Sequence, residues 1–279
     1  MASPVQEHPY ARFIERVKKP AQYLGGESGE IRKDWEAARG RICLAFPDLY
    51  EVGMSHLGFK ILYGVLNARD ELLAERAYAP ARDLEQVLRD EGEALRSLES
   101  WRPLSDFDVV GFSLQFELTF TNVLGMLDLG GLPLRSEHRG DDDPLVIAGG
   151  PVATHAESMA LFFDAILIGD GEEAATEIAL EWVRAKREGL PRAERLIRLS
   201  RIAGVYVPSL YETAVDPDTG FEVATRSRAG SGAPFPVERR LLDDIDRFPF
   251  PDDGPVGGPE AIFDRMSIEV ARGCTEGCR

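Results

Sequence analysis

Two of the three cysteines lie close together, Cys274 and Cys278, in the segment ARGCTEGCR (271–279). A thiolate is a soft metal ligand, and a CxxxC pair presents two thiolates on one short loop. Two ligands are too few for a complete metal or iron–sulfur site. The pair by itself therefore leaves open unspecialised thiols, part of a zinc site or part of a thiolate cluster. Arg272 and Arg279 would favour the thiolate, although surface solubility explains them equally well.

Three loops form a second set of candidates, because each directly follows a short apolar run. They are PDLYEVGMSHLGFK (47–60), then Ser113 with Leu114 and Gln115, and then Gly149 with Gly150 and Pro151. In an open parallel sheet, ligands bind at the carboxyl ends of the strands, near the point where the strand order reverses. Glycine lets a flat ligand lie against bare backbone, and a serine hydroxyl donates a hydrogen bond without filling the space. Gly-Gly-Pro is also a plain turn signal, so both interpretations stay open for that loop.

The elements that must position these loops lie between Arg41 and Gly189, where short apolar runs alternate with amphipathic segments. This alternation is typical of strand and crossover-helix units that build a parallel sheet. The runs predict five strands, at 42–46, 75–79, 108–113, 144–149 and 164–169. Most are nearly continuous in apolar residues, as strands covered on both faces are. We therefore expect an α/β fold with a doubly wound parallel sheet.

Helices are predicted between the strands from apolar residues at helical spacing. The stripes are Leu57 with Ile61 and Val65, Leu84 with Leu88, Leu95 and Leu98, and Ile178 with Trp182. Asp83 with Gln86 predicts a capping box, and Gly189 with Pro191 predicts a helix end. These stripes are interpreted as core rather than as cofactor contacts.

Beyond Gly189 the pattern changes. A basic amphipathic helix is predicted at 191–200, and YVPSLYETAV, DPDTG and FEVATR (206–226) predict a β-hairpin. Residues 229–262 are rich in Pro, Gly and Asp, which is typical of a connector. RMSIEVA (265–271) predicts one more apolar strand, directly before the two cysteines.

Composition and charge exclude several classes of function. Of 279 residues, 44% are hydrophobic and 29% charged, which is ordinary for one large or two modest globular domains. The formal net charge of −16, with scattered basic residues, disfavours nucleic acid as a partner. No apolar stretch reaches the roughly 20 residues of a membrane helix, and no signal-peptide core begins the chain. We therefore expect a cytoplasmic protein without a membrane partner.

Nucleotide-binding and disulfide signatures are missing from the sequence. No GxxxxGK[ST] occurs, no GxGxxG follows the first strand, and the acidic loop GDGEE (169–173) would repel a phosphate. That loop suits the helix dipole and is interpreted as a cap and lid. Three cysteines do not make a disulfide framework, so reduced thiols or metal ligands are expected. Cys43, inside the first strand, is interpreted as a small buried hydrophobe.

The three loops together resemble the cofactor contacts of cobalamin-binding domains, which are flavodoxin-like (Rossmann-like) sheets. In that family the first loop carries DxHxxG, whose histidine can bind cobalt from below. With Gly58 in place of the family glycine, Gly53 holds the Asp position and Ser55 holds the His position. The resemblance therefore implies cobalamin without a protein ligand to cobalt, and His56 as a polar loop contact or a satisfied semi-buried histidine. The implied contacts are Gly53, Ser55, His56, Gly58, Ser113, Leu114, Gly149, Gly150 and Pro151.

Cys274 and Cys278, which follow an apolar strand and Ala-Arg-Gly, look like the first two cysteines of CxxxCxxC in radical S-adenosylmethionine enzymes. In that family three thiolates hold a four-iron four-sulfur cluster whose open iron binds S-adenosylmethionine, and reduction yields a deoxyadenosyl radical. The resemblance implies that both cysteines are metal ligands and that a third would stand at position 281. The catalytic barrel would follow residue 279 and would be the partner of this portion within the same protein.

The order of KKPAQYLGGE (18–27), PDLYEVGMSHLG (47–58) and VARGCTEGC (270–278) resembles one family of cobalamin-binding radical S-adenosylmethionine proteins over nearly the full chain. The implied parts are an N-terminal arm at 1–38, a cobalamin-binding domain at 39–190, a helix, hairpin and linker at 191–262, and the start of a radical barrel at 263–279. The substrate and the catalytic residues stay unassigned, and this portion alone is expected to be inactive. One alternative is a flavodoxin-like module for a flavin or a corrinoid without radical chemistry. Another is an interaction domain whose terminal cysteines share zinc with a partner.

Overall fold

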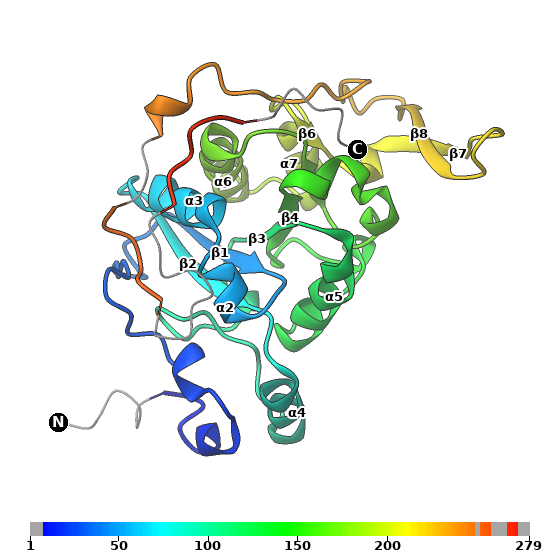
Figure 1. Cartoon of the computed structure of the whole chain (residues 1–279). Coiled ribbons are helices and arrows are strands. Elements are labelled where there is room, and N and C mark those ends of the chain that lie inside the picture. The colour runs from blue at the N-terminus through cyan, green and yellow to red at the C-terminus, as the bar shows by residue number, and fades with distance from the viewer. Residues whose placement is uncertain (1–7, 249–251, 258–266, 273–279) are drawn as a thin grey trace.

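The computed structural model describes residues 8–248, 252–257 and 267–272. Its centre is a sheet of six strands in the order β2-β1-β3-β4-β5-β6 (Figure 1). The strands are β1 (Gly40–Phe46), β2 (Leu72–Tyr78), β3 (Val109–Ser113), β4 (Leu145–Gly149), β5 (Ala165–Leu167) and β6 (Val205–Tyr206). The first five are parallel, and β6 pairs with β5 in the antiparallel direction. The order of β1 to β5 confirms the flavodoxin-like doubly wound sheet, and it reverses between β1 and β3.

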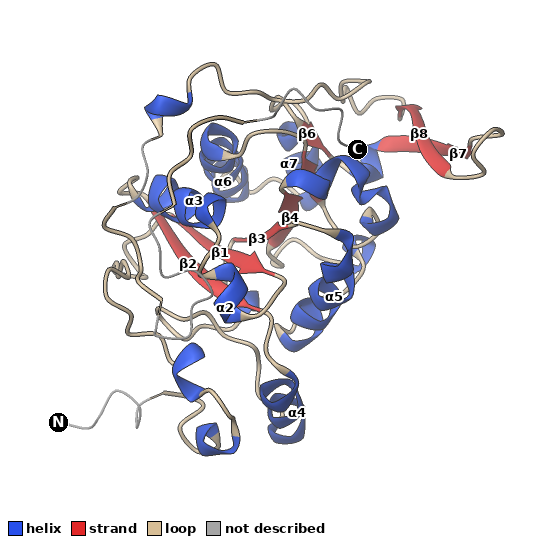
Figure 2. Ribbon diagram, viewed as in Figure 1, coloured by secondary structure: helices blue, strands red, loops and turns tan. Residues whose placement is uncertain are grey.

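Helices cover both faces of this sheet (Figure 2). The α-helices are α2 (Tyr50–Gly53), α3 (Leu57–Asn67), α4 (Arg82–Glu91), α5 (Phe120–Leu129), α6 (Glu172–Arg187) and α7 (Arg192–Leu199). The 3-10 turns are η1 (Ile14–Arg16), η2 (Pro20–Gln22), η3 (Leu104–Asp106), η4 (Glu117–Thr119), η5 (Ser136–His138), η6 (Pro151–Met159), η7 (Pro208–Leu210) and η8 (Ile245–Arg247). No helix in the described part of the chain is both long and apolar enough to cross a membrane.

Successive residues of each strand point to opposite faces, so the molecule has two apolar cores. On one face, Ile42 and Leu44 of β1 pack with α3, α6 and α7. On the other face, Cys43 and Ala45 pack with α4, α5 and the N-terminal residues around Phe13. Cys43 is fully buried, and burial raises the pKa of its thiol, as the interpretation of this residue as a small hydrophobe requires.

Two predictions about α4 are wrong. The helix ends at Glu91 because Gly92 adopts the left-handed conformation, with φ of 64°. Leu95 and Leu98 therefore belong to the next segment, although both are buried. The predicted capping box is also missing, because α4 begins at Arg82 after the N-cap residue Ala81, so Asp83 lies inside the first turn. The carboxylate of Asp83 instead accepts a hydrogen bond from the backbone N–H of Lys18 at 2.9 Å.

The C-terminal third confirms the basic helix, as α7, and the hairpin. Strands β7 (Tyr211–Val215) and β8 (Glu222–Ser227) pair in the antiparallel direction and project away from the sheet (Figure 1). The strand expected at 265–271 is not observed where it can be judged. A strand needs a hydrogen-bonded neighbour, and among the described residues none pairs with 267–271. Residues 265 and 266 lie outside the described ranges.

Candidate functional site

A cavity of about 580 Å³ opens at the carboxyl edge of the sheet and extends between the sheet and helices α3 and α6. Its floor and walls are mostly apolar and include Ile42, Leu44, Gly111, Ile147 and Leu167 from the strands and Leu62, Leu66 and Ile178 from the helices. Polar groups lie at its mouth. They are His56, Ser113, Gln115, Thr154, Asp170, Glu172, Arg239, Glu269 and Arg272. An apolar hollow with a few polar groups at the opening is the usual form of a small-molecule site.

Gly111 creates much of the room in this cavity. It lies in the middle of β3, a central strand, where a glycine costs stability because it has no side chain to pack. A Cβ placed there would lie 3.8 Å from Cγ2 of Ile147 and 4.0 Å from Cδ2 of Leu44, which are ordinary contact distances. Any larger side chain would extend into the cavity. The sequence did carry this signal, since a glycine inside a strand marks the close approach of another group, but the prediction overlooked it.

Six of the nine predicted cofactor contacts line the cavity, namely His56, Gly58, Ser113, Gly149, Gly150 and Pro151. They come from the three loops after β1, β3 and β4, so the topology brings together what is up to 95 residues apart in the sequence, from His56 to Pro151. Their contact with cobalamin stays a prediction.

The other three predicted residues, Gly53, Ser55 and Leu114, do not line the cavity. A Cβ on Gly53 would lie 2.3 Å from the ring of Tyr78, so this glycine lets α2 pack against β2. The hydroxyl of Ser55 donates to the carbonyl of Glu51 at 2.8 Å. Leu114 is fully buried. These residues shape the loops rather than the cavity wall.

Gly150 fixes the shape of the third loop. Its φ is 107°, and a Cβ there would lie 2.5 Å from the carbonyl oxygen of Leu114. The backbone N–H of Leu114 donates in turn to the carbonyl of Gly149 at 2.7 Å. The glycine pair is therefore both a turn and part of the cavity wall, and its contact with a ligand stays a prediction.

His56 caps the start of α3 at the mouth of the cavity. Its Nδ1 accepts a hydrogen bond from the backbone N–H of Phe59 at 3.2 Å. Burial lowers the pKa of His56, against a hydrogen bond with the side chain of Gln115 that raises it, so the imidazole is neutral near pH 7. Because Nδ1 is the acceptor, the ring proton lies on Nε2. Gln115 also donates to the hydroxyl of Ser113 at 3.2 Å, within the second loop, so its hydrogen bond with His56 is the one that links the first and second loops.

Arg272, in the last described segment (267–272), lies at the mouth of the cavity. Its guanidinium pairs with Glu172, with Asp170 at 3.2 Å and with Glu269 at 2.7 Å. Hydrogen bonds with Glu269 and Glu172 raise the pKa of Arg272, so it stays charged. Glu172 is the first residue of α6, as the acidic loop predicted. An acidic loop that is occupied by an arginine is not a phosphate site.

Cys274 and Cys278, the predicted metal ligands, lie outside the described residues. Within the described ranges, no group of three or more His, Cys, Asp or Glu side chains could hold a metal ion.

The family model for radical SAM proteins, N-terminal, matches residues 58–208. Two solved structures of TsrM, a radical S-adenosylmethionine methyltransferase from Kitasatospora setae, are similar to this chain. One contains a tryptophan substrate and the S-adenosylmethionine analogue aza-SAM; it is 15% identical, with a TM-score of 0.36, over 64% of this chain and 29% of that one. The other contains cobalamin and a [4Fe-4S] cluster; it is 15% identical, with a TM-score of 0.36, over 65% of this chain and 30% of that one. The match thus covers less than a third of TsrM, and no curated protein matches.

Proposed function

Since the chain belongs to the family of radical SAM proteins, N-terminal, whose model covers residues 58–208 of 279, we propose that it is the cobalamin-binding part of a radical S-adenosylmethionine enzyme. The observation that carries this proposal is the cavity itself. It lies where a doubly wound sheet binds its ligands, and it continues as an apolar space between the sheet and two helices.

The residues present suit a corrinoid better than a nucleotide. The cavity volume of about 580 Å³ is within the usual range of roughly 300–1,000 Å³ for small-molecule sites. Below its mouth the cavity is mostly apolar, which does not suit the phosphate groups of a nucleotide. The flat macrocycle would lie over the rim, where Gly149, Gly150 and Ser113 leave the backbone accessible. The aromatic base of its nucleotide tail would enter the apolar space beside Gly111.

His56 would serve as a hydrogen-bond donor rather than as a cobalt ligand. A metal ligand needs a nitrogen with a free lone pair, and Nδ1 of His56 already accepts from Phe59. Its Nε2 carries the proton and can donate to an amide or a water molecule at the mouth. The implied absence of a protein ligand to cobalt thus gains a physical reason in the capping geometry of α3.

Cys274 and Cys278 would supply two of the three thiolates of a four-iron four-sulfur cluster. That cluster, with S-adenosylmethionine and cobalamin, would supply the radical or methyl-transfer chemistry. The role of this chain is to hold the segment before the cysteines against the cavity mouth, through Arg272 and Glu172. The substrate would be chosen elsewhere in the protein.

Binding of hydroxocobalamin to the purified chain tests this proposal. We expect the corrinoid absorbance to co-elute with the protein in gel filtration, and we expect riboflavin 5′-phosphate under the same conditions not to co-elute. Retention of the flavin alone would favour the flavodoxin-like flavin module. Failure of both ligands to bind would refute the proposal.

The cluster needs a second experiment, on a protein in which this chain is followed by the proposed radical barrel. Anaerobic reconstitution with iron and sulfide is expected to give one four-iron cluster there, and Cys274→Ser or Cys278→Ser is expected to abolish it. Bound zinc in place of iron would favour the interaction domain. If that longer protein never assembles iron and sulfide, the radical part of the proposal is contradicted.

A further inference from the structure

The segment KKPAQYLGGE (18–27) has no role in the proposed function, yet together with the next six residues it lies along α2 and α3. We call residues 18–33 the brace. The first cavity loop (47–60) contains α2 and the start of α3, and His56 lies between these two helices. Helix α3 also forms one wall of the cavity through Leu62 and Leu66. The contacts of the brace with these helices are polar and specific.

The first contact is made to α2. The Nζ of Lys19 lies 2.7 Å from Oε1 of Glu51, and the side chain of Gln22 also forms a hydrogen bond with Glu51. Gln22 is buried, with 5% of its surface exposed. Glu51, in the first turn of α2, is thus bonded to two residues of the brace.

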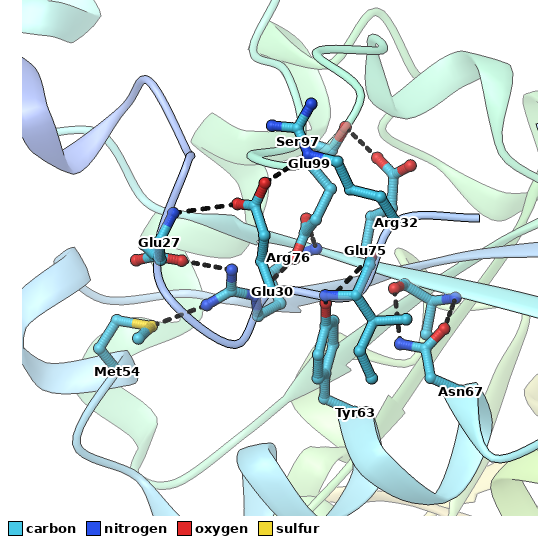
Figure 3. Close-up of polar contacts among 12 residues, drawn as sticks. Glu27, Glu30, Arg32, Met54, Tyr63, Asn67, Glu75, Arg76, Ser97 and Glu99 are labelled. Carbon is cyan, nitrogen blue, oxygen red and sulfur yellow. Dashed lines mark hydrogen bonds and ion pairs between the residues drawn. The ribbon is translucent and has the colours of Figure 1, made fainter. Parts of the chain in front are cut away.

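The second contact is a buried ion pair cluster (Figure 3). Glu27 accepts hydrogen bonds from the hydroxyl of Tyr50 in α2 and from Nη2 of Arg76 in β2. Nε of Arg76 donates to Glu99 at 2.6 Å, and Nη1 contacts the sulfur of Met54 at 3.0 Å. Side-chain exposure is 2% for Arg76, 9% for Glu27 and 1% for Glu99. The brace therefore supplies one carboxylate of a desolvated triad that also holds both ends of α2.

The third contact runs along α3. The backbone N–H of Ile31 donates to the hydroxyl of Tyr63 at 2.8 Å. The Nζ of Lys33 donates to the carbonyl of Asn67, the last residue of α3, at 2.7 Å. It also donates to the carbonyls of Arg69, in the following turn, and Leu72, the first residue of β2, both at 2.8 Å. The carbonyl of Asn67 is one that a helix end leaves without an internal partner. The brace thus holds α3 from its middle to its last turn.

We propose that the brace is a positioning element of the cavity, which keeps α2 and α3 at the distance from the sheet that the cavity requires. Glu27 is its central residue, because its carboxylate joins the brace to both α2, through Tyr50, and β2, through Arg76. Residues 39–190, the span expected to form the cobalamin-binding domain, are then an incomplete binding unit without 18–33. The ligand part of this inference rests on the proposed function, whereas the positioning part does not.

The experiment compares Glu27→Gln with Glu91→Gln in the full chain. Both changes replace a carboxylate by an amide in a contact of the N-terminal arm. Glu91 pairs with Arg16 at the surface and touches neither α2 nor α3. Hydrogen exchange of peptides from 47–67 is compared with that of peptides from 144–167, which cover β4 and β5. The ¹⁵N shifts of the His56 imidazole report its tautomer without any ligand, and hydroxocobalamin titration gives the Kd.

For Glu27→Gln we expect exchange in 47–67 to accelerate about tenfold or more, because the guanidinium of Arg76 loses one of its two buried carboxylates. Exchange in 144–167 should stay unchanged. The His56 shifts should move toward a mixture of tautomers, and the Kd should rise about tenfold. Glu91→Gln should alter none of these. If Glu27→Gln does not fold, Lys19→Met, at a surface position, should accelerate exchange in 50–56 about threefold.

Unchanged exchange in 47–67 in both variants of the brace, or acceleration that is equal in 144–167, would overturn the inference. A wild-type chain that binds no corrinoid would refute the proposed function alone, since exchange and the His56 shifts still test the brace.

Discussion

Replacement of Gly111 by valine should distinguish an open cavity from a closely packed core, because the two cases predict opposite signs for the change in stability. If the space beside β3 is open, Gly111→Val adds a β-branched residue to a central strand. It removes the entropic penalty of glycine, about 0.5–1 kcal/mol, and buries extra methyl groups worth about 0.8 kcal/mol each at most. The free energy of unfolding of the ligand-free chain should then rise by about 1–2 kcal/mol. In a closed core the same change would overpack the sheet and lower it by about 1–3 kcal/mol.

The distances at Gly111 support the first case. Its Cβ position lies 3.8 Å from Ile147 and 4.0 Å from Leu44, so the first added carbon meets no clash. The remaining carbons point into the cavity and would occupy the space proposed for the base of the corrinoid. We therefore expect binding to weaken at least about 100-fold, equivalent to about 3 kcal/mol, while the fold becomes more stable.

Urea titration at constant slope measures the stability change, and hydroxocobalamin titration measures the affinity. Gly125→Ala, in α5 on the opposite face, is the matched control, because nothing lies within 4 Å of its Cβ position. It should stabilise by up to about 1 kcal/mol through helix propensity and leave the Kd unchanged. A destabilised Gly111→Val chain, or one that binds the corrinoid as tightly as the wild type, would refute this reasoning.

Three further outcomes are expected from single changes. Burial raises the pKa of Glu99 from 4.5 to about 7, against the attraction of Arg76. The protonated carboxyl therefore contributes up to about 3 kcal/mol to the free energy of unfolding below pH 4.5, and this contribution is lost as the pH rises through 7. Urea titration of His8→Gln between pH 4 and 8 should reveal that fall. Burial lowers the pKa of His8 from 6.5 to about 4, so the contribution of His8 to the free energy of unfolding is lost as the pH falls below 6.5. Urea titration of Glu99→Gln should reveal this opposite dependence on pH. A stability that does not change with pH in either variant would contradict these pKa shifts. Gly150→Ala should lower the free energy of unfolding by at least about 2 kcal/mol in thermal melts, because its φ is 107° and its Cβ would lie 2.5 Å from the carbonyl oxygen of Leu114, and an unchanged melting temperature would disprove that strain.

The sheet could be predicted from the sequence because its strands are short, continuous apolar runs. Strand β6 could not, since Val205–Tyr206 offers only two residues and becomes a strand through pairing with β5. The same limit applies to the end of α4. The spacing of Leu95 continues the apolar stripe, but the backbone turns at Gly92, and only the left-handed conformation there shows it.

The cavity could be predicted in part. Loops that follow parallel strands must meet at one edge, so Ser113 and Gly149 were placed correctly by topology alone. The direction of a side chain on a short helix depends on packing, which is why Ser55 turns back to Glu51 and His56 reaches the cavity. The pairing of Arg272 with Glu172 spans 100 residues of chain and has no local signal.

The guanidinium of Arg272 has a mechanical consequence. It bonds directly to the first turn of α6 and stands two residues before Cys274, so the lip of the hollow and the start of the cysteine segment are tied by a single side chain. A displacement of that turn would therefore also act on Arg272 and on the described segment 267–272 to which it belongs.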